Sequence, residues 1–256
     1  MLQNTPRRAS RPAVLSALAL PLALGLTACN KESADSGGLS GEPIAKIAPP
    51  AGKAWADMVS KTAEGGYRMG NPDAPIKLVE YASYTCSHCA EVSEQGGAAL
   101  RDEFVASGRV RLELRNFVRD PFDLATALGA RCGAPESFFA LSEQAFANQK
   151  AMFEKVQAAD KAAMDAVGSL PLDKRLVRVG ELAGLTEFFA ARGVAKDQAN
   201  ACLANVAEAE ALSKRTQEQG EQYKIEGTPT FMVNGSTIGS MGWEELRSRL
   251  QSLGAR

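Results

Sequence analysis

Hydrophobic and polar residues follow two different patterns in the middle of the chain. IKLVEYA (76–82) is almost continuously apolar, which predicts a strand buried on both faces. Val92, Leu100 and Phe104 then recur at helical spacing. The stretch at 110–118 alternates apolar and polar residues, which predicts a second strand with one exposed side. The order in this region is therefore strand, helix, strand.

Helical periodicity dominates from about residue 120 to 222, where strand signals are scarce. Gly and Pro residues divide this block into predicted helices at 123–132, 136–147, 151–167, 173–192 and 196–222. TFMV, Asn234-Gly235 and STIG then predict a hairpin, because Asn-Gly supplies the two positive φ angles of a tight turn. An amphipathic helix over 243–253 closes the chain. The predicted order is therefore strand, helix, strand, a helical block, a hairpin and a helix.

The first 28 residues have the order of a bacterial export signal. A basic start is followed by an apolar run over 14–26 and by small residues before Cys29. The alternative is an N-terminal transmembrane anchor, although the run is shorter than the about 20 residues that span a membrane. Leu26-Thr27-Ala28-Cys29 resembles a bacterial lipobox, in which Cys29 receives a lipid and the chain is cleaved before it. We therefore expect an exported, periplasmic protein that its lipid anchors to a bacterial membrane.

Residues 29–52 are rich in Gly, Ser, Ala and Pro, which predicts a flexible tether ahead of a domain at 53–254. Removal of residues 1–28 takes away three arginines and no acidic residue. The processed chain then has 26 basic and 30 acidic residues and a net charge of −4. This balance gives no reason to expect nucleic acid as a partner.

The chain has five cysteines. If Cys29 carries a lipid, four remain, an even number in a compartment that permits disulfides. Cys86 and Cys89 form one natural pair, which leaves Cys132 and Cys202 for a second. The alternative is that these last two are unrelated buried thiols.

The CSHC motif at 86–89 is compatible with a zinc site, a copper site, a redox centre or a structural disulfide. A structural zinc site needs four ligands, but His88 is the single histidine of the chain, and the remaining cysteines are 70 residues apart from each other. We therefore expect no zinc. Copper(I), which suits soft thiolates, stays an alternative. The single histidine also argues against a hydrolase. A hydrolase needs a catalytic His that a third group holds in place, whereas His88 lies between the two sulfurs of the motif.

A redox centre has a physical basis in this motif. If Cys86 opens the helix, its sulfur faces unpaired N–H groups and the positive end of the helix dipole. Both favour the thiolate, as does a cationic or hydrogen-bonding neighbour such as His88. A stabilised thiolate stabilises the reduced form, so that the disulfide becomes a stronger oxidant. The residues therefore favour an oxidising centre.

Together with two distant features, this motif carries a family resemblance. Gly227-Thr228-Pro229-Thr230 resembles a cis-proline loop that opens the next strand, and the helical block at about 120–222 has a matching size. Glu80 lies six residues before the motif, where the family has a buried acid. From about Tyr67 to its end, the chain resembles the DsbA-like thiol:disulfide oxidoreductases. The resemblance implies a thioredoxin-like α/β fold with an inserted all-helical domain.

The resemblance also implies roles for the site residues. Cys86 is the exposed sulfur that substrate thiolates attack, and Cys89 is the shielded sulfur that leaves and closes again. Pro229, in cis after Thr228, packs beside the disulfide and keeps a backbone edge free for an extended substrate. Glu80 moves protons to Cys89; the alternative is a carboxylate bonded to water at the end of its strand.

Two residues depart from the family pattern. Ser87 replaces the proline of Cys-Pro-His-Cys, and Thr228 is commoner in isomerase- and reductase-type relatives. The resemblance further implies a second disulfide, Cys132–Cys202, and no cofactor. It also implies a monomer, because the stretch ahead of Gly65 is too short for the dimerisation domain of DsbC-type isomerases.

The expected function is therefore oxidation of the thiols of substrate proteins to disulfides through Cys86 and Cys89. A membrane redox partner would restore the disulfide. One alternative is a reductase or isomerase of the same fold. A copper(I)-binding lipoprotein, with the two cysteines as ligands, is the other.

Overall fold

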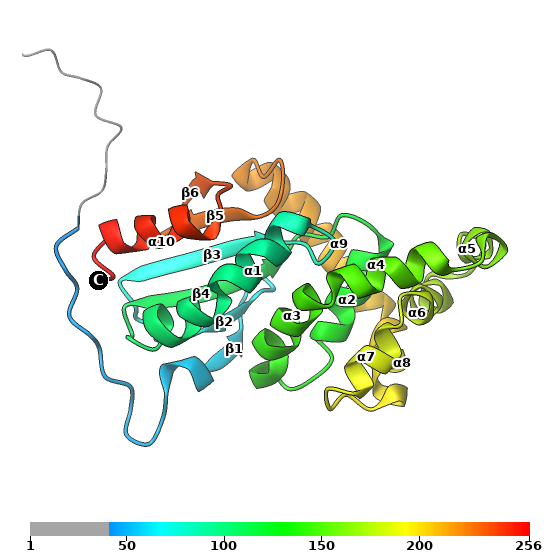
Figure 1. Ribbon diagram of the computed structural model, residues 1–256, viewed down its shortest axis with the longest axis horizontal. Helices are drawn as coiled ribbons and strands as arrows, with labels where there is room; N and C mark the ends of the chain where they lie inside the picture. Colours follow the sequence, from blue (N-terminus) through cyan, green and yellow to red (C-terminus); the bar gives the residue numbers. More distant parts are fainter. Residues whose placement is uncertain (1–40) are drawn as a thin grey trace, which may run out of the picture. The chain divides into compact units, whose positions relative to one another are not determined.

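The computed structural model describes residues 41–256, which contain a six-stranded mixed sheet (Figure 1). The strands lie in the order β1-β2-β4-β3-β5-β6; β3 and β4 are parallel, and every other neighbouring pair is antiparallel. Because β3 lies in the middle of the sheet, the residues that follow it emerge at the centre of one edge. The strand bounds are β1 (Val59–Lys61), β2 (Tyr67–Met69), β3 (Ile76–Ala82), β4 (Val110–Asn116), β5 (Thr230–Val233) and β6 (Ser236–Gly239).

The helices of the described residues fall into two groups. One group, α1 and α10, shares a hydrophobic core with the strands of the sheet. The other, α2 to α9, forms a continuous helical block between β4 and β5 (Figure 1). This order confirms the predicted α/β fold with a helical insertion. The helix bounds are α1 (Ser87–Ala99), α2 (Pro121–Ala130), α3 (Phe138–Ala147), α4 (Gln149–Ala158), α5 (Lys161–Val167), α6 (Leu172–Leu182), α7 (Leu185–Ala190), α8 (Lys196–Leu203), α9 (Val206–Tyr223) and α10 (Trp243–Ser252).

Three of the predicted helices are each two helices in the structure: 151–167, 173–192 and 196–222. In the first, Asp160 caps α5 by accepting from Ala162 N at 3.3 Å. The second breaks at Gly184, whose φ of 69° ends a helix. In the third, Asn205 caps α9 by accepting from Glu208 N at 3.1 Å. The apolar periodicity continues across these positions, but a helix cap or a positive φ angle ends the helix there.

The strand β3 and the β5–β6 hairpin form as their local sequences predict. Asn234 and Gly235 have φ angles of 50° and 86°, both positive as the Asn-Gly turn requires. The Asn234 side chain also accepts from Lys77 N at 2.9 Å, which attaches the turn to the start of β3. The three-residue strands β1 and β2 have too short a pattern to be found in the sequence.

The strand β4 is buried on both faces, so the predicted exposed side is wrong. Its charged residues Glu113 and Arg115 are only 3 % and 8 % exposed. Arg115 Nε donates to Glu113 Oε1 at 2.7 Å, and Thr62 Oγ1 donates to the same oxygen at 2.8 Å. The alternating polar residues of this strand therefore form a buried ion pair in which each charge has a partner.

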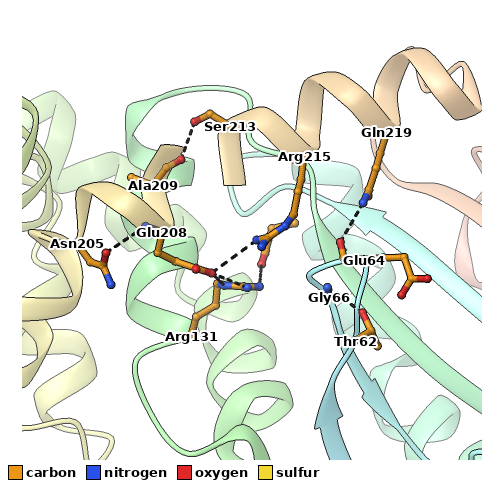
Figure 2. Close-up of polar contacts among 11 residues, drawn as sticks. Thr62, Glu64, Gly66, Arg131, Asn205, Glu208, Ala209, Ser213, Arg215 and Gln219 are labelled. Atoms are coloured by element: carbon orange, nitrogen blue, oxygen red, sulfur yellow. Dashed lines mark hydrogen bonds and ion pairs between the residues drawn. The ribbon is translucent and has the colours of Figure 1, made fainter. Parts of the chain in front are cut away.

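The long helix α9 contacts the end of α2 near its start and the edge of the sheet further along (Figure 2). Near its start, Glu208 Oε1 accepts from Arg131 Nη2 at 2.7 Å and from Arg131 Nε at 3.0 Å. Three turns later, Gln219 Nε2 donates to the backbone oxygen of Glu64 at 2.9 Å, in the turn between β1 and β2. Arg215 lies between these points, 3.9 Å from Glu208. Through these bonds α9 joins the end of α2 to the β1–β2 turn at the edge of the sheet.

The segment 41–52 has no helix or strand but is attached to the domain. Gly41 N donates to Ser252 O, and Ile44 N donates to Gly254 O at 2.9 Å. The predicted flexible tether is therefore wrong for this part of 29–52. The predicted signal, Cys29 and the rest of the tether lie outside the described residues. Within 41–256, no helix is both long and apolar enough to cross a membrane.

Candidate active site

The two cysteines of the CSHC motif lie between the end of β3 and the first turn of α1. Cys86 is the N-cap of α1, with an extended backbone (φ −92°, ψ 119°), and its carbonyl oxygen accepts from Ala90 N at 3.2 Å. Cys89 lies within the first turn and has no exposed surface. Both are free thiols. The position of Cys86 is favourable for a thiolate, because the first N–H groups of a helix have no partner within it.

The sheet brings the predicted proline loop to Cys86. The Thr228–Pro229 peptide bond is cis. The loop leads into β5, which pairs with β3 so that Thr230 lies opposite Tyr81. Cys86 Sγ lies 3.0 Å from Thr228 O, across 142 positions of sequence. Two segments that are far apart in the chain therefore meet at the sulfur.

Cys86 is more buried than the exposed sulfur that the resemblance implies. The residue is 4 % exposed, because the loop at Thr228 lies against it. A hollow of about 310 Å³ lies next to His88 and Pro229, and Cys86 is not part of its lining. The hollow is lined by His88, Glu91, Val92, Gln95, Pro229, Ser240, Met241 and Gly242.

The surroundings of Cys86 stabilise its thiolate. A hydrogen bond from the Cys89 thiol is the largest effect that lowers the pKa of Cys86, to about 5, and burial opposes it. Thr228 and the backbone N–H groups of Cys89 and His88 lower this pKa further. With a pKa of about 5 in place of the ordinary 9.0, Cys86 is largely a thiolate at neutral pH in the reduced protein.

Burial acts in the opposite direction on Cys89 and Glu80, because it favours their neutral forms. Burial raises the pKa of the Cys89 thiol, and the hydrogen bond to Cys86 and the charge of Glu80 raise it further. Glu80 lies in β3 and is 7 % exposed. Burial, with the charge of Cys86, raises the pKa of its carboxyl from 4.5 to about 7. A buried carboxyl with this pKa is able to exchange a proton near neutral pH.

Replacing Glu80 by Gln should remove a pH dependence of stability from the reduced protein. The pKa of Glu80 is higher in the folded protein than in the unfolded chain, so the folded state binds the proton more tightly. The stability that this gives is fully present below about pH 4.5 and is lost as the pH rises through about 7. Relative to Glu80→Gln, the free energy of unfolding of the wild type should fall by roughly 3 kcal/mol between about pH 4 and pH 8. Urea unfolding at several pH values measures it. Equal pH profiles would contradict the buried, titrating carboxyl.

His88 points away from the sulfur. Its imidazole Nδ1 lies 3.4 Å from Glu91 Oε2, and its side chain is 78 % exposed. What His88 contributes to the lowered pKa of Cys86 is its backbone N–H. The sequence-based expectation that the His88 ring acts on the sulfur therefore has no contact to support it in the structure. His88 lowers the pKa of Cys86 because its position at the start of the helix directs its backbone N–H to the sulfur.

The loop between β3 and Cys86 is held by residues of α2. Asp123 accepts from Ser83 Oγ at 2.6 Å and from Tyr84 N at 2.7 Å. Asp120, which caps α2, accepts from Thr85 Oγ1 at 2.5 Å. These bonds fix all three residues ahead of Cys86.

Two further side chains of the helical block reach the same loop. Tyr84 Oη and Ser142 Oγ are 2.7 Å apart, and Gln149 donates to two carbonyl oxygens of the loop. Sequence reasoning missed Ser142, Gln149 and Asp123. A signal existed only for Asp120, since Asp before Pro121 is a typical start of a helix.

The structure places a disulfide between Cys132 and Cys202, as the resemblance implies. Their Cα atoms are 5.7 Å apart, and 70 positions separate them in sequence. Cys132 follows α2 and Cys202 lies in α8, so the bond lies within the helical block, separate from Cys86 and Cys89. It joins the start of the block to its later part.

Potential metal ligands do not gather into a cluster in the described part of the chain. Within 41–256 there is no group of three or more His, Cys, Asp or Glu side chains that could hold an ion. The copper(I) alternative from the sequence, with Cys86 and Cys89 as ligands, stays a prediction.

Comparison with known families gives a match over most of the chain. Residues 62–252 match the family model described as thioredoxin. A protein of Rickettsia bellii that carries the name protein-disulfide oxidoreductase is 26 % identical over 175 residues, which are 68 % of this chain and 59 % of that protein. The chain thus spans little more than half the length of this relative.

Solved structures are similar as well. The crystal structure of a protein-disulfide isomerase from Novosphingobium aromaticivorans has 32 % identity and a TM-score of 0.68, over 72 % of this chain and 95 % of that one. Wolbachia pipientis alpha-DsbA1 has 17 % identity and a TM-score of 0.61, over 76 % and 93 % of the two chains. This second likeness shows a shared fold.

Proposed function

Since the chain belongs to the DsbA-like thiol:disulfide oxidoreductases of the thioredoxin family, we propose that it exchanges disulfides with substrate proteins through Cys86 and Cys89. The observation that carries this proposal is the contrast between the two sulfurs. Cys86 has a lowered pKa of about 5 at a helix start, whereas burial and its neighbours raise the pKa of Cys89 one turn later. One sulfur is thus a good leaving group and the other a shielded one.

The proposed reaction begins from the Cys86–Cys89 disulfide. A substrate thiolate attacks Cys86 Sγ, the bond between the two cysteines breaks, and Cys89 leaves as a thiolate. Glu80, with its carboxyl pKa of about 7, can supply the proton that Cys89 takes up. A second substrate thiolate then attacks the substrate sulfur of the mixed disulfide, and Cys86 leaves as a stable thiolate. The substrate loses two electrons and the cysteine pair gains them.

We propose oxidation as the direction of this exchange. The low pKa of Cys86 supports it, because a stabilised thiolate stabilises the reduced form of the pair. A second candidate is isomerisation. It is favoured by the 32 % identical relative, which is named a protein-disulfide isomerase. Thr228 before the cis proline points the same way.

The test is a reaction between the oxidised protein and a reduced peptide that has two cysteines. Mass spectrometry should show one peptide disulfide formed for each Cys86–Cys89 disulfide lost, with a mixed disulfide at Cys86 as the intermediate. A scrambled disulfide substrate added to the reduced protein tests isomerisation in parallel. If neither peptide changes, the proposed exchange is wrong.

The proposed site of action is the periplasmic face of a bacterial membrane. The basic start, the apolar run and the Cys29 motif of the sequence support export and lipid attachment. A membrane redox partner that reoxidises the pair, and reduced polypeptides as substrates, follow from the proposed oxidation.

Replacing Cys29 by Ser should release the protein from the membrane. Lipid attachment needs the Cys29 sulfur, whereas the described domain does not include this residue. Fractionation of cells should find the wild type with the membranes and the variant in the soluble fraction or as an uncleaved precursor. A mature variant that stays with the membranes after a salt wash would contradict lipid anchoring.

A further inference from the structure

Gln149 is the side chain of the helical block that reaches the backbone of Cys86. It is the first residue of α4 and is 9 % exposed. Its Nε2 donates to Tyr84 O at 2.8 Å and to Cys86 O at 3.0 Å. One amide group therefore binds two carbonyl oxygens of the active-site loop, across more than 60 positions of sequence.

These two bonds fix the peptide groups on both sides of the segment Thr85–Cys86. The Tyr84 carbonyl belongs to the peptide group ahead of Thr85, and the Cys86 carbonyl belongs to the one that follows Cys86. The same Cys86 carbonyl accepts from Ala90 N, the first bond of the helix. With both ends held, the backbone between them cannot rotate freely, and the direction of the Cys86 side chain is set.

Other side chains of the block hold neighbouring positions. Asp123 and Asp120 bind Ser83, Tyr84 and Thr85, as described above. Their bonds end one residue short of Cys86. Within residues 41–256, the hydrogen bond from the helical block to the Cys86 backbone is the one that Gln149 donates.

We propose that Gln149 is a positioning residue through which the helical block holds Cys86 Sγ over the N–H groups of His88 and Cys89. This inference rests on the proposed function, since it concerns the sulfur that reacts. Gln149 touches neither the sulfur nor a substrate; it acts through the backbone of Cys86. Without its amide, two buried carbonyl oxygens lose a donor, the loop relaxes, and the sulfur moves away from the groups that stabilise its charge.

The test compares Gln149→Met, which keeps the length and removes the donor, with Gln144→Met as the matched control. Gln144 is exposed and bonds to Ala140 and Arg192, away from the site. The thiolate absorbance of the reduced proteins is titrated against pH. The midpoint should rise by about one unit in Gln149→Met and stay unchanged in Gln144→Met. In glutathione buffers at pH 7, the reduced form of the pair should lose about tenfold in stability, because one pKa unit is a factor of ten.

A merely structural role predicts a different outcome. Gln149→Met would then melt at a lower temperature but titrate at the wild-type midpoint, which would overturn the proposal. If the variant does not fold, the test is made on the wild type by nuclear magnetic resonance. The side-chain N–H₂ signals of Gln149 should then shift as Cys86 titrates. Signals that stay constant would also overturn it. These titrations need no substrate, so they stand apart from a failure of the exchange reaction itself.

Discussion

Replacing Cys86 by Ser should reduce disulfide exchange with a two-cysteine peptide to the rate measured without protein. A hydroxyl oxygen cannot form the mixed disulfide, and Cys89, with its raised pKa and no exposed surface, cannot replace Cys86 as the reacting sulfur. The loss should therefore be complete at every pH from 5 to 8. The measurement is the rate of peptide oxidation, followed by mass spectrometry after acid quenching.

The matched variant is Cys89→Ser, which keeps the reacting sulfur. Its Cys86 should still form a mixed disulfide with a peptide disulfide but should not resolve it, so that a one-to-one adduct accumulates. The Ser hydroxyl can donate to Cys86 as the Cys89 thiol does, so the thiolate stays stabilised. Exchange that continues at the wild-type rate in Cys86→Ser would remove the redox interpretation of the motif.

The double variant Cys132→Ala, Cys202→Ala should lose about 4 kcal/mol of unfolding free energy. The bond closes a loop of 70 residues, and in the chain-entropy model a crosslink of this size restricts the unfolded chain by that amount. Exchange at Cys86 should continue, because the bond lies within the helical block. Urea unfolding and the peptide assay measure the two effects separately.

The control for this prediction removes the Cys86–Cys89 pair, which forms a disulfide in the oxidised protein. In a Cys86→Ser, Cys89→Ser background, Cys132–Cys202 is the one disulfide in the described residues. A reducing agent should lower the unfolding midpoint of this background by the same amount as the double substitution. No response to the reducing agent would show that the bond adds no stability.

Local patterns were sufficient for the parts of the site that depend on neighbouring residues. The apolar run of β3 predicts the strand that presents Cys86, and Asn234-Gly235 predicts the hairpin turn behind Pro229. The position of Cys86 at a helix start follows from the CSHC motif and the periodicity after it. Each of these features is set within a few residues of the chain.

The residues that hold the loop could not be predicted in this way. Gln149 and Asp123 contact Tyr84 across 65 and 39 positions, and nothing in their own neighbourhoods indicates it. The alternation in β4 is similar: it cannot show that Thr62 and Arg115 pair with Glu113 in the interior. Such contacts depend on how the helical block packs on the sheet, which the periodicity of either part does not contain.

The central claim, that the pair is built to oxidise substrates, is tested most directly by its reduction potential. The chain from Asn30 onward is equilibrated with glutathione buffers, quenched with acid, and the oxidised fraction of Cys86 and Cys89 is measured by mass spectrometry. With a Cys86 pKa of about 5, we expect a potential above about −180 mV. A potential near that of thioredoxin, about −270 mV, would contradict oxidation as the function.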